Sequence, residues 1–263
     1  MERLLLAGAV LLLAGCSWSP TAERCAAEGL GLTACPGPGV VRGIDVSSYQ
    51  GSIDWALSAG DGVAFAFARV SDGAGDIDGH FAHNWRAIKR AGVLRGAYQF
   101  FRAGEDATAQ AELMVQLIEL AGGLEVSDLG VAIDIETADG QSSDTVQSQV
   151  RLWLHAAEQL TGRVPILYTN AATSPLLGTG FAEYPLWVAN WDVGCPAMPG
   201  GWSNWRFWQT SSTGTVAGIE GPVDIDEFNG TLEELLGKED GGIDTGPVKT
   251  EGGERTTECV VAE

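Results

Sequence analysis

Short runs rich in β-branched and aromatic residues alternate with helical patterns along most of this chain. We interpret eight runs as strands, at residues 40–46, 63–70, 94–100, 131–135, 164–168, 186–189, 207–210 and 223–228. Apolar residues recur at helical spacing over residues 77–91, 107–121 and 145–160, and Thr161-Gly162 provides a stop signal for the last helix. The alternation indicates an α/β fold with a parallel sheet, and eight strands favour a closed barrel.

The spacing of the eight runs predicts an irregular barrel. The centres of the first five runs are about 23 to 36 residues apart, which leaves room for a helix in each connection. The centres of the last four runs are only about 17 to 22 residues apart. A full crossover helix hardly fits there, so we expect loops or single turns between the final strands.

Acidic residues occur at the ends of several predicted strands. In barrels of this kind the chemistry is placed at the C-terminal strand ends. The acidic residues at or near such ends are Asp45, Asp72, Asp134, Glu136, Asp224 and Asp226. No Lys or His joins them there, so the predicted site is strongly acidic.

Asp134 and Glu136 form the most informative pair of these acids. Side chains on a strand alternate between faces, so the two carboxylates point the same way. An exposed strand with a polar face is the simplest explanation, but the flanking Val131, Ile133 and Ile135 argue against it. Two acids in a cleft suit glycoside hydrolysis, in which one is protonated and the other ionised, or the binding of a divalent metal ion.

Aromatic residues favour the first of these two chemistries. The chain has nine Trp, and Trp187, Trp191, Trp202, Trp205 and Trp208 fall within 22 residues. We expect about half of the Trp to be core residues. Sugar rings stack on aromatic side chains, so an acidic groove lined by Trp and Tyr suits a glycan. The three histidines, His80, His83 and His155, lie on predicted helices, and we interpret them as surface or packing residues.

The charge of the chain excludes some partners. There are 35 acidic and 15 basic side chains, which gives a net charge of −20. Phosphate backbones require clustered Lys and Arg, so we expect no nucleic-acid partner. We also expect no metal and no cofactor, and a monomeric protein.

The first 15 residues have the pattern of an export signal. An apolar run of ten residues, 4–13, follows Arg3 and is too short to span a bilayer, which takes about 20 residues. Leu13-Ala14-Gly15-Cys16 resembles the lipobox of bacterial lipoproteins, although an ordinary signal peptide with an incidental Cys is the alternative. The resemblance implies lipidation at Cys16 and anchoring at the cell surface, and Ser17 after it favours the outer membrane.

The remaining chain divides into three parts by composition. Residues 16–39 contain Ser, Pro, Gly and Cys and are interpreted as a leader or linker. Residues 40–236 contain every predicted strand and form the barrel domain. Residues 237–263 are acidic and rich in Gly, and we expect this tail to contribute little to the fold.

Four cysteines remain after Cys16, and in an oxidising compartment we expect them to pair. They are Cys25, Cys35, Cys195 and Cys259, which allow three connectivities. Cys25 and Cys35 enclose a short loop and are the favoured pair, which leaves Cys195 for Cys259. A zinc site is the competing interpretation, but there is no C-x-x-C and no His close to any Cys in sequence.

Eight segments of the chain together resemble glycoside hydrolase family 25, the lysozymes of the Chalaropsis type. In chain order they are GIDVSSYQG (43–51) with IDW (53–55), FAFARVSDG (65–73), GAYQFF (96–101), DIE (134–136), PILYT (165–169), LWVA (186–189), FWQ (207–209) and GPVDIDEFNG (221–230). The resemblance covers about residues 42–232, nearly the whole predicted barrel.

The resemblance implies a (β/α)5(β)3 barrel and an N-acetylmuramidase that cuts the β-1,4 bond after N-acetylmuramic acid in the glycan strands of peptidoglycan. By the matching motifs, Glu136 resembles the general acid and Asp134 its partner, which stabilises the charged intermediate or assists the substrate's acetamide. Asp45 and Asp224 match the flanking acids. Weaker matches for substrate contacts are Asp72, Tyr98, Tyr168, Trp191 and Gln209.

Two positions depart from the family pattern. The second segment commonly ends in Lys-x-x-Glu-Gly, whereas this chain has Arg69 and the shorter acid Asp72. The third often carries His where Gln99 stands, but strand alternation places Gln99 on the face opposite Tyr98. The alternatives to a muramidase are a non-catalytic wall-binding lipoprotein on the same fold and a metal-dependent hydrolase. The presence of all four main carboxylates argues against the first of these.

Overall fold

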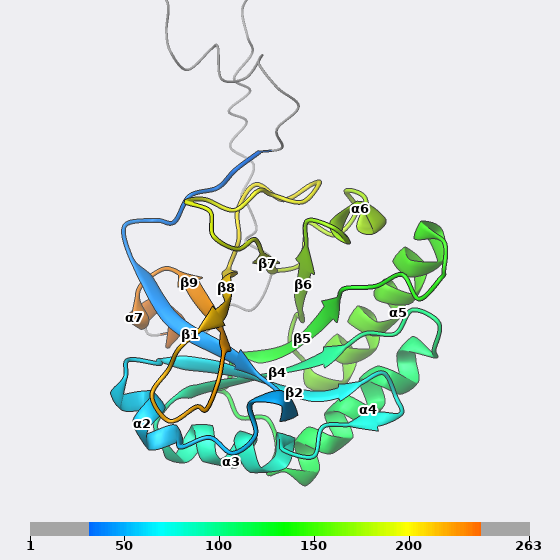
Figure 1. Cartoon of the computed structure of the whole chain (residues 1–263). Helices are drawn as coiled ribbons and strands as arrows, with labels where there is room; N and C mark the ends of the chain where they lie inside the picture. Colours follow the sequence, from blue (N-terminus) through cyan, green and yellow to red (C-terminus); the bar gives the residue numbers. More distant parts are fainter. Residues whose placement is uncertain (1–31, 238–263) are drawn as a thin grey trace, which may run out of the picture. The chain divides into compact units, whose positions relative to one another are not determined.

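Eight strands form a closed barrel in this protein (Figure 1). The computed structural model describes residues 32–237. The barrel strands are β1 (Val40–Val46), β2 (Phe65–Asp72), β4 (Leu94–Phe100), β5 (Gly130–Ile135), β6 (Ile166–Asn170), β7 (Leu186–Ala189), β8 (Phe207–Gly214) and β9 (Val223–Asn229). Their order around the barrel is β1-β9-β8-β7-β6-β5-β4-β2, and pairing of β1 with β2 closes it. The predicted barrel is therefore confirmed.

The last strand runs against its neighbours. All other neighbouring barrel strands are parallel, but β9 pairs antiparallel with both β8 and β1. The strand–helix alternation predicted a parallel sheet, and β9 is the exception, because the short connection from β8 to β9 makes a hairpin rather than a crossover. As a result, the start of β9 lies beside the C-terminal end of β1, where Asp224 pairs with Asp45.

The helices occupy the connections between the early strands. They are α2 (Trp55–Gly60), α3 (Phe81–Arg90), α4 (Ala107–Leu120) and α5 (Ser143–Thr161), with the 3-10 turn η1 (Ser48–Gln50) and the short helices α6 (Ser174–Leu177) and α7 (Leu232–Leu235). The three predicted helices are confirmed. Helix α3 begins four residues later than expected because Asp76–Ile77 form the short strand β3 against the end of β2.

Local capping explains where these helices begin and end. The Asp106 and Ser142 side chains accept hydrogen bonds from the backbone N–H groups of Ala109 and Thr145, at the starts of α4 and α5. Gly162 ends α5 in the left-handed conformation, with φ of 68°, as the Thr161-Gly162 signal predicted. Among residues 32–237, no helix is both long and apolar enough to cross a membrane.

Aromatic side chains fill the inside of the barrel. Phe67 stacks on Trp187 with ring centroids 4.5 Å apart, and Phe207 contacts Phe65 and Phe67 edge to face. Gly96 provides the space for Phe67, because a Cβ at this position would lie 2.2 Å from that ring. The aromatic packing fills the barrel below the strand ends, so space inside the barrel remains only above it.

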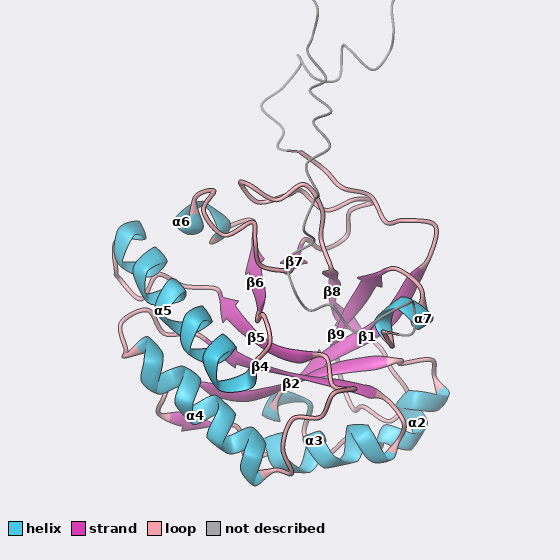
Figure 2. Cartoon of the chain, turned by 180° about the vertical axis from the view of Figure 1, so that it is seen from behind, coloured by secondary structure: helices cyan, strands magenta, loops and turns pink. Residues whose placement is uncertain are grey.

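A second apolar layer lies between the strands and the long helices. Figure 2 shows α3, α4 and α5 gathered along one side of the sheet, whereas loops predominate beside β7 and β8. Trp85 of α3, Met114 of α4 and Trp153 of α5 are fully buried in this layer. The loop connections expected for the late strands are therefore confirmed.

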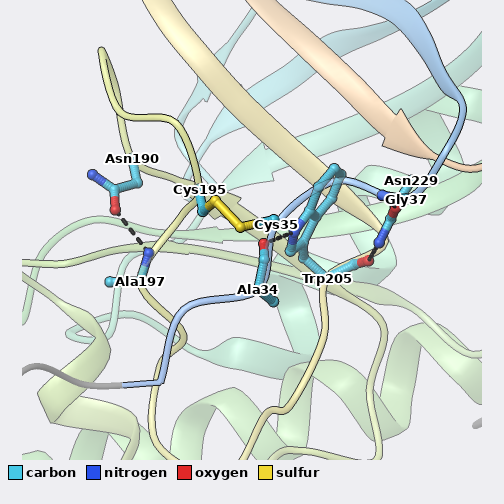
Figure 3. The surroundings of a disulfide bond; sticks show 8 residues. All are labelled: Ala34, Cys35, Gly37, Asn190, Cys195, Ala197, Trp205 and Asn229. Carbon is cyan, nitrogen blue, oxygen red and sulfur yellow. Dashed lines mark hydrogen bonds between the residues drawn. A yellow bond between two sulfur atoms is a disulfide. The ribbon is translucent and has the colours of Figure 1, made fainter. Parts of the chain in front are cut away.

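Residues 33–37 are fastened to the barrel rather than forming a free leader. Thr33 bridges Ala197, and the Trp205 indole Nε1 donates to the Ala34 carbonyl at 2.7 Å. Figure 3 shows the Cys35–Cys195 disulfide between these contacts. We call residues 32–37 the N-terminal strap. Its backbone pairs with the segment after β7, so this part of the expected leader belongs to the domain.

The Cys35–Cys195 disulfide corrects the expected cysteine pairing. Neither the favoured Cys25–Cys35 pair nor the Cys195–Cys259 pair is compatible with it. The short loop between Cys25 and Cys35 suggested the wrong partner because sequence proximity does not report which segments the fold brings together. Cys16, Cys25 and Cys259 lie outside the described residues, as do the export signal and all of the expected tail but Gly237.

Candidate active site

A cavity of about 290 Å³ opens at the C-terminal ends of the parallel strands. It is lined by residues from all eight barrel strands or from the segments just after them. The contribution of β9 is Asp224, near its start. The lining residues are Asp45, Ser47, Tyr49, Gln50, Arg69, Tyr98, Phe100, Asp134, Glu136, Tyr168, Asn170, Trp187, Trp191, Gln209, Ser212 and Asp224. All four carboxylates predicted as catalytic are among them.

The four carboxylates differ in depth. Asp45 near the end of β1 and Asp134 near the end of β5 are each only 5% exposed. Glu136 directly follows β5 and is exposed at the opening of the cavity, and Asp224 is intermediate. A buried and an exposed acid therefore stand two residues apart on the same strand face, as the alternation predicted.

Burial raises the pKa of every one of these four acids. For Asp134 the neighbouring charge of Glu136 raises the pKa further, and Arg69 opposes this. For Asp224, burial and the Glu136 charge raise the pKa to about 6. Burial also raises the pKa of Glu136, against a hydrogen bond with Tyr168 that lowers it. Close carboxylates do not ionise independently, so this group of acids keeps its protons to higher pH than free carboxyl groups do.

Gln209 organises one wall of the cavity. Its Oε1 accepts hydrogen bonds from the Tyr168 hydroxyl at 3.2 Å and from the Trp191 indole Nε1 at 2.9 Å. Its Nε2 donates to Oδ2 of Asp45 at 2.6 Å. Three of the predicted substrate contacts are thus joined to a predicted catalytic acid. Tyr98, the fourth predicted contact that lines the cavity, packs edge to face against Trp187.

Arg69 is a site residue that the sequence reasoning did not select. It is the only basic residue among those lining the cavity. Its Nε donates to Oδ2 of Asp78 at 3.2 Å, and its guanidinium lies 5.2 Å from the centre of the Tyr49 ring. The sequence does contain a signal for this position. Arg69 follows Phe65 and Phe67 at alternate positions of one strand, so its side chain shares their inward face.

Asp72, predicted as a substrate contact, is not among the residues that line the cavity. Its two carboxylate oxygens accept hydrogen bonds from Nε and Nη2 of Arg102, at 2.5 and 2.6 Å. In this bidentate ion pair both oxygens of the Asp72 carboxylate are bound by the Arg102 guanidinium. Gln99 points away from the cavity as predicted, and its amide bonds Ser71, Gln110 and Trp153.

The tryptophans are more deeply buried than expected. Seven of the eight in the described part of the chain are core residues, and only Trp191 is largely exposed, at 49%. None of the three histidines lines the cavity. Within residues 32–237, no group of three or more His, Cys, Asp or Glu side chains is arranged to hold a metal ion.

Comparisons with known proteins agree with this geometry. The family model described as "Glycosyl hydrolases family 25" matches residues 44–219. Protein YegX of Escherichia coli K12, described as uncharacterized, is 38% identical over 212 residues, which cover 78% of this chain and 76% of YegX. Lysozyme M1 of Streptomyces globisporus is 36% identical over 210 residues, which cover 74% of this chain and 70% of that protein.

A solved structure shows the same architecture. The bacterial lysozyme of Streptomyces coelicolor superposes with a TM-score of 0.70 at 32% sequence identity. The match covers 80% of this chain and 99% of that one. The similarity therefore covers most of this chain and nearly all of that lysozyme.

Proposed function

This chain belongs to glycosyl hydrolase family 25, and from that membership we propose that it is a muramidase that hydrolyses the β-1,4 bond between N-acetylmuramic acid and N-acetylglucosamine in peptidoglycan. It is a glycoside hydrolase, and the glycan strands of the wall are its substrate class. The observation that carries the proposal is the convergence of Asp45, Asp134, Glu136 and Asp224 in one cavity lined by Tyr and Trp.

Glu136 acts as the general acid in this mechanism. Its exposed position at the opening of the cavity gives it access to the leaving oxygen of the glycosidic bond. Burial raises its pKa, which favours the protonated form that this step requires. As the bond breaks, the proton moves from Glu136 to the oxygen of the departing sugar, and Glu136 becomes a carboxylate that can activate a water molecule.

Asp134 stabilises the positive charge that develops on the muramic acid ring. The Cα atoms of residues two apart on a strand are separated by roughly 6.6 Å, and both side chains leave one face. That arrangement is a poor match to an inverting pair, whose carboxyl groups stand about 6.5–9.5 Å apart with a water molecule between them. We therefore propose net retention, with either Asp134 or the substrate's own acetamide supporting the intermediate.

The flanking residues orient the sugar. Asp45 and Asp224 supply acceptors for its hydroxyl or amide groups, and Trp191 offers a half-exposed ring for stacking. Gln209 holds Asp45 and Trp191 in a fixed relation through its two hydrogen bonds. Tyr98 and Tyr168 close the inner wall of the cavity.

Clearing of a suspension of purified peptidoglycan, with and without EDTA, tests the proposed function. We expect clearing in both conditions and release of new reducing ends. Binding to the wall without clearing would instead identify a non-catalytic wall-binding protein. Clearing that EDTA abolishes would identify a metal-dependent hydrolase.

The stereochemistry has its own test. NMR of a defined peptidoglycan fragment reports which anomer of the product forms first. We expect the β-anomer, because the β bond is cleaved with retention. An initial α-anomer would contradict the retaining mechanism while leaving the muramidase activity intact.

We also propose that the chain carries an export signal and a lipid anchor. Leu13-Ala14-Gly15-Cys16 supports lipidation at Cys16, with the protein held at the outer membrane or cell surface as a monomer. In this proposal residues 1–15 are removed, residues 40–236 carry the catalytic barrel, and residues 237–263 form a tail. Replacing Cys16 by Ala should abolish membrane association and change the intact mass; unchanged fractionation and mass would contradict the anchor.

A further inference from the structure

Arg102 lies two residues after β4 and joins the ends of three neighbouring strands. Its Nε and Nη2 donate to the two carboxylate oxygens of Asp72, the last residue of β2, at 2.5 and 2.6 Å. Its Nη1 donates to Oδ1 of Asp139, in the segment after β5, at 3.1 Å. Strands β2, β4 and β5 are neighbours in the barrel, so one guanidinium bridges three consecutive strand ends. We call Asp72, Arg102 and Asp139 the rim clamp.

Arg102 is itself held in place by its own backbone and by a ring. The side chain of Gln110, fully buried in α4, accepts a hydrogen bond from the Arg102 N–H at 3.0 Å and donates one to the Arg102 carbonyl at 2.9 Å. The guanidinium lies 4.6 Å from the centre of the Phe100 ring, which lines the cavity. Arg102 is not among the lining residues, so it is fixed beside the cavity and outside it.

The segment that Arg102 binds directly follows Glu136. Both carboxylate oxygens of Asp139 are bound there, because Oδ2 accepts a hydrogen bond from the Ala103 N–H at 2.7 Å. The Asp139 N–H donates to Oγ1 of Thr137 at 3.0 Å. Asp139 has a φ of 49°, a left-handed conformation that is uncommon in residues other than Gly. The contacts to residues 102–103 hold the turn in this conformation, immediately after Glu136.

Glu136 depends on its backbone for its position. It is exposed at the opening of the cavity, so packing does not confine its side chain. On the preceding side, the Ile135 carbonyl accepts a hydrogen bond from Oγ1 of Thr173 at 2.8 Å, and β5 pairs with β6. On the following side, the turn at residues 137–139 is bound to Arg102. The backbone of Glu136 is therefore fixed from both directions along the chain.

We propose that Arg102 is a positioning residue for the hydrolytic reaction: through Asp139 it fixes the turn after Glu136 and so places the carboxyl group of the general acid at the glycosidic oxygen. The role of Glu136 rests on the proposed muramidase function, whereas the restraint of the turn by Arg102 does not. A displacement of a catalytic group by about 1 Å can reduce the rate by about 10²-fold. Loss of the rim clamp should therefore lower kcat more than it raises KM, because Arg102 lies outside the cavity.

Three variants test the rim clamp. Arg102→Ala removes every contact of the guanidinium. Arg102→Lys keeps the charge but lacks the planar fork, so it cannot bind Asp72 through two N–H groups and Asp139 at the same time. Asp139→Gly removes both acceptors, suits the left-handed conformation and leaves the contact of Arg102 with Phe100 in place, so it frees the turn without strain.

The control is Arg42→Ala. Arg42 forms an ion pair with Asp61 at 3.5 Å, and its side chain is 37% exposed, compared with 35% for Arg102. It lies near the start of β1 and is not among the residues that line the cavity. Arg42→Ala therefore removes an Arg–Asp pair of similar exposure that has no contact with the turn after Glu136.

The first test needs no substrate. Hydrogen exchange followed by mass spectrometry reports how strongly the backbone amides of the full chain are protected. Peptides that contain residues 137–141 should exchange about tenfold faster in Arg102→Ala and Asp139→Gly, the factor expected for losing a hydrogen bond to a charged group. Exchange in β1 and β6 should match the wild type. Unchanged exchange over residues 137–141 in both variants would overturn the proposal.

The second test measures hydrolysis of a soluble peptidoglycan fragment at a temperature where the proteins are folded. Arg102→Ala and Asp139→Gly should lose about 10- to 100-fold in kcat with a smaller change in KM. Arg102→Lys should lose less than Arg102→Ala, and Arg42→Ala should match the wild type. If Arg102→Ala does not fold, Arg102→Lys and Asp139→Gly still give the comparison.

An unchanged kcat in Asp139→Gly, a loss confined to KM, or an equal loss in Arg42→Ala would each overturn the proposal. A wild-type protein without activity on the wall would refute the proposed function instead. The exchange measurement would still decide whether Arg102 restrains the turn after Glu136.

Discussion

Asp134 and Glu136 leave the same face of β5 two residues apart, yet Asp134 is buried and Glu136 stands exposed at the cavity opening. Burial raises the pKa of both acids, and the charge of Glu136 raises the pKa of Asp134 further. Two neighbouring carboxyl groups do not ionise independently, so the pair retains a proton to higher pH than two free carboxyl groups would.

Replacing Glu136 by Gln should reduce turnover by about 10²–10⁴-fold, since the amide keeps the shape and has no proton to transfer. Binding to purified wall should be retained. The measurement is the rate of reducing-end release together with a pull-down on insoluble peptidoglycan. Glu183→Gln is the matched control, because Glu183 lies on the surface in a loose 3.9 Å contact with Arg151 and should leave the rate unchanged. Full activity in Glu136→Gln would refute its assignment as the general acid.

Asp224 should make the folded protein less stable as pH rises from about 4 to 6. Its pKa is raised to about 6 from 3.8, so the folded chain holds a proton in this window that the unfolded chain has lost. Asp224→Asn should remove this loss, which is at most about tenfold in the unfolding equilibrium constant per pH unit and smaller where solvent screens the group. Thermal unfolding of both proteins across this pH range measures the difference. Parallel curves would contradict the raised pKa.

Removing the Cys35–Cys195 disulfide should destabilise the fold and loosen the wall of the cavity. The bond joins residues 160 apart in sequence and ties the N-terminal strap to the segment after β7, which begins with Asn190 and Trp191. Replacing both cysteines by Ser should lower the free energy of unfolding by about 2–4 kcal/mol. KM for wall fragments should rise, because Trp191 is less well held. Unfolding by denaturant and steady-state kinetics measure the two effects, and an unchanged midpoint would show that the strap is held by its other contacts.

Replacing Asp128 by Ala should lower the free energy of unfolding without changing the catalytic rate of the folded protein. Asp128 forms a buried bidentate pair with Arg95, at 2.8 and 3.0 Å, and the Arg95 guanidinium lies 4.0 Å from the Trp85 ring centre. The pair is at the start of β4, away from the cavity. Loss of Asp128 leaves the buried Arg95 guanidinium with only the half-exposed Glu125 carboxylate, at 3.8 Å, and breaking a buried pair costs about 3–5 kcal/mol.

The control for Asp128→Ala is Glu183→Ala, which breaks a surface contact and should cost no more than about 1 kcal/mol. Denaturant unfolding gives both values. A loss of kcat in Asp128→Ala at a temperature where it remains folded would contradict the purely structural role of this pair.

Much of the barrel could be predicted from local pattern. The alternation of apolar residues placed all eight strands, and the shortening gaps between them predicted the connections without long helices. Alternation also predicted that Asp134 and Glu136 share a face and that Gln99 points away from Tyr98. These properties depend on residues that are close together within one segment. The alternation of side chains along a strand is therefore enough to predict them.

The partners of each segment were decided only by the tertiary structure. The antiparallel direction of β9 brings Asp224 beside Asp45, and the sequence contained no local sign of that direction. The same holds for the disulfide between Cys35 and Cys195, for the ion pair that removes Asp72 from the cavity, and for the depth of Asp226. Each depends on contacts between residues far apart in the chain, whose free energies are set by packing and burial rather than by the local run of side chains.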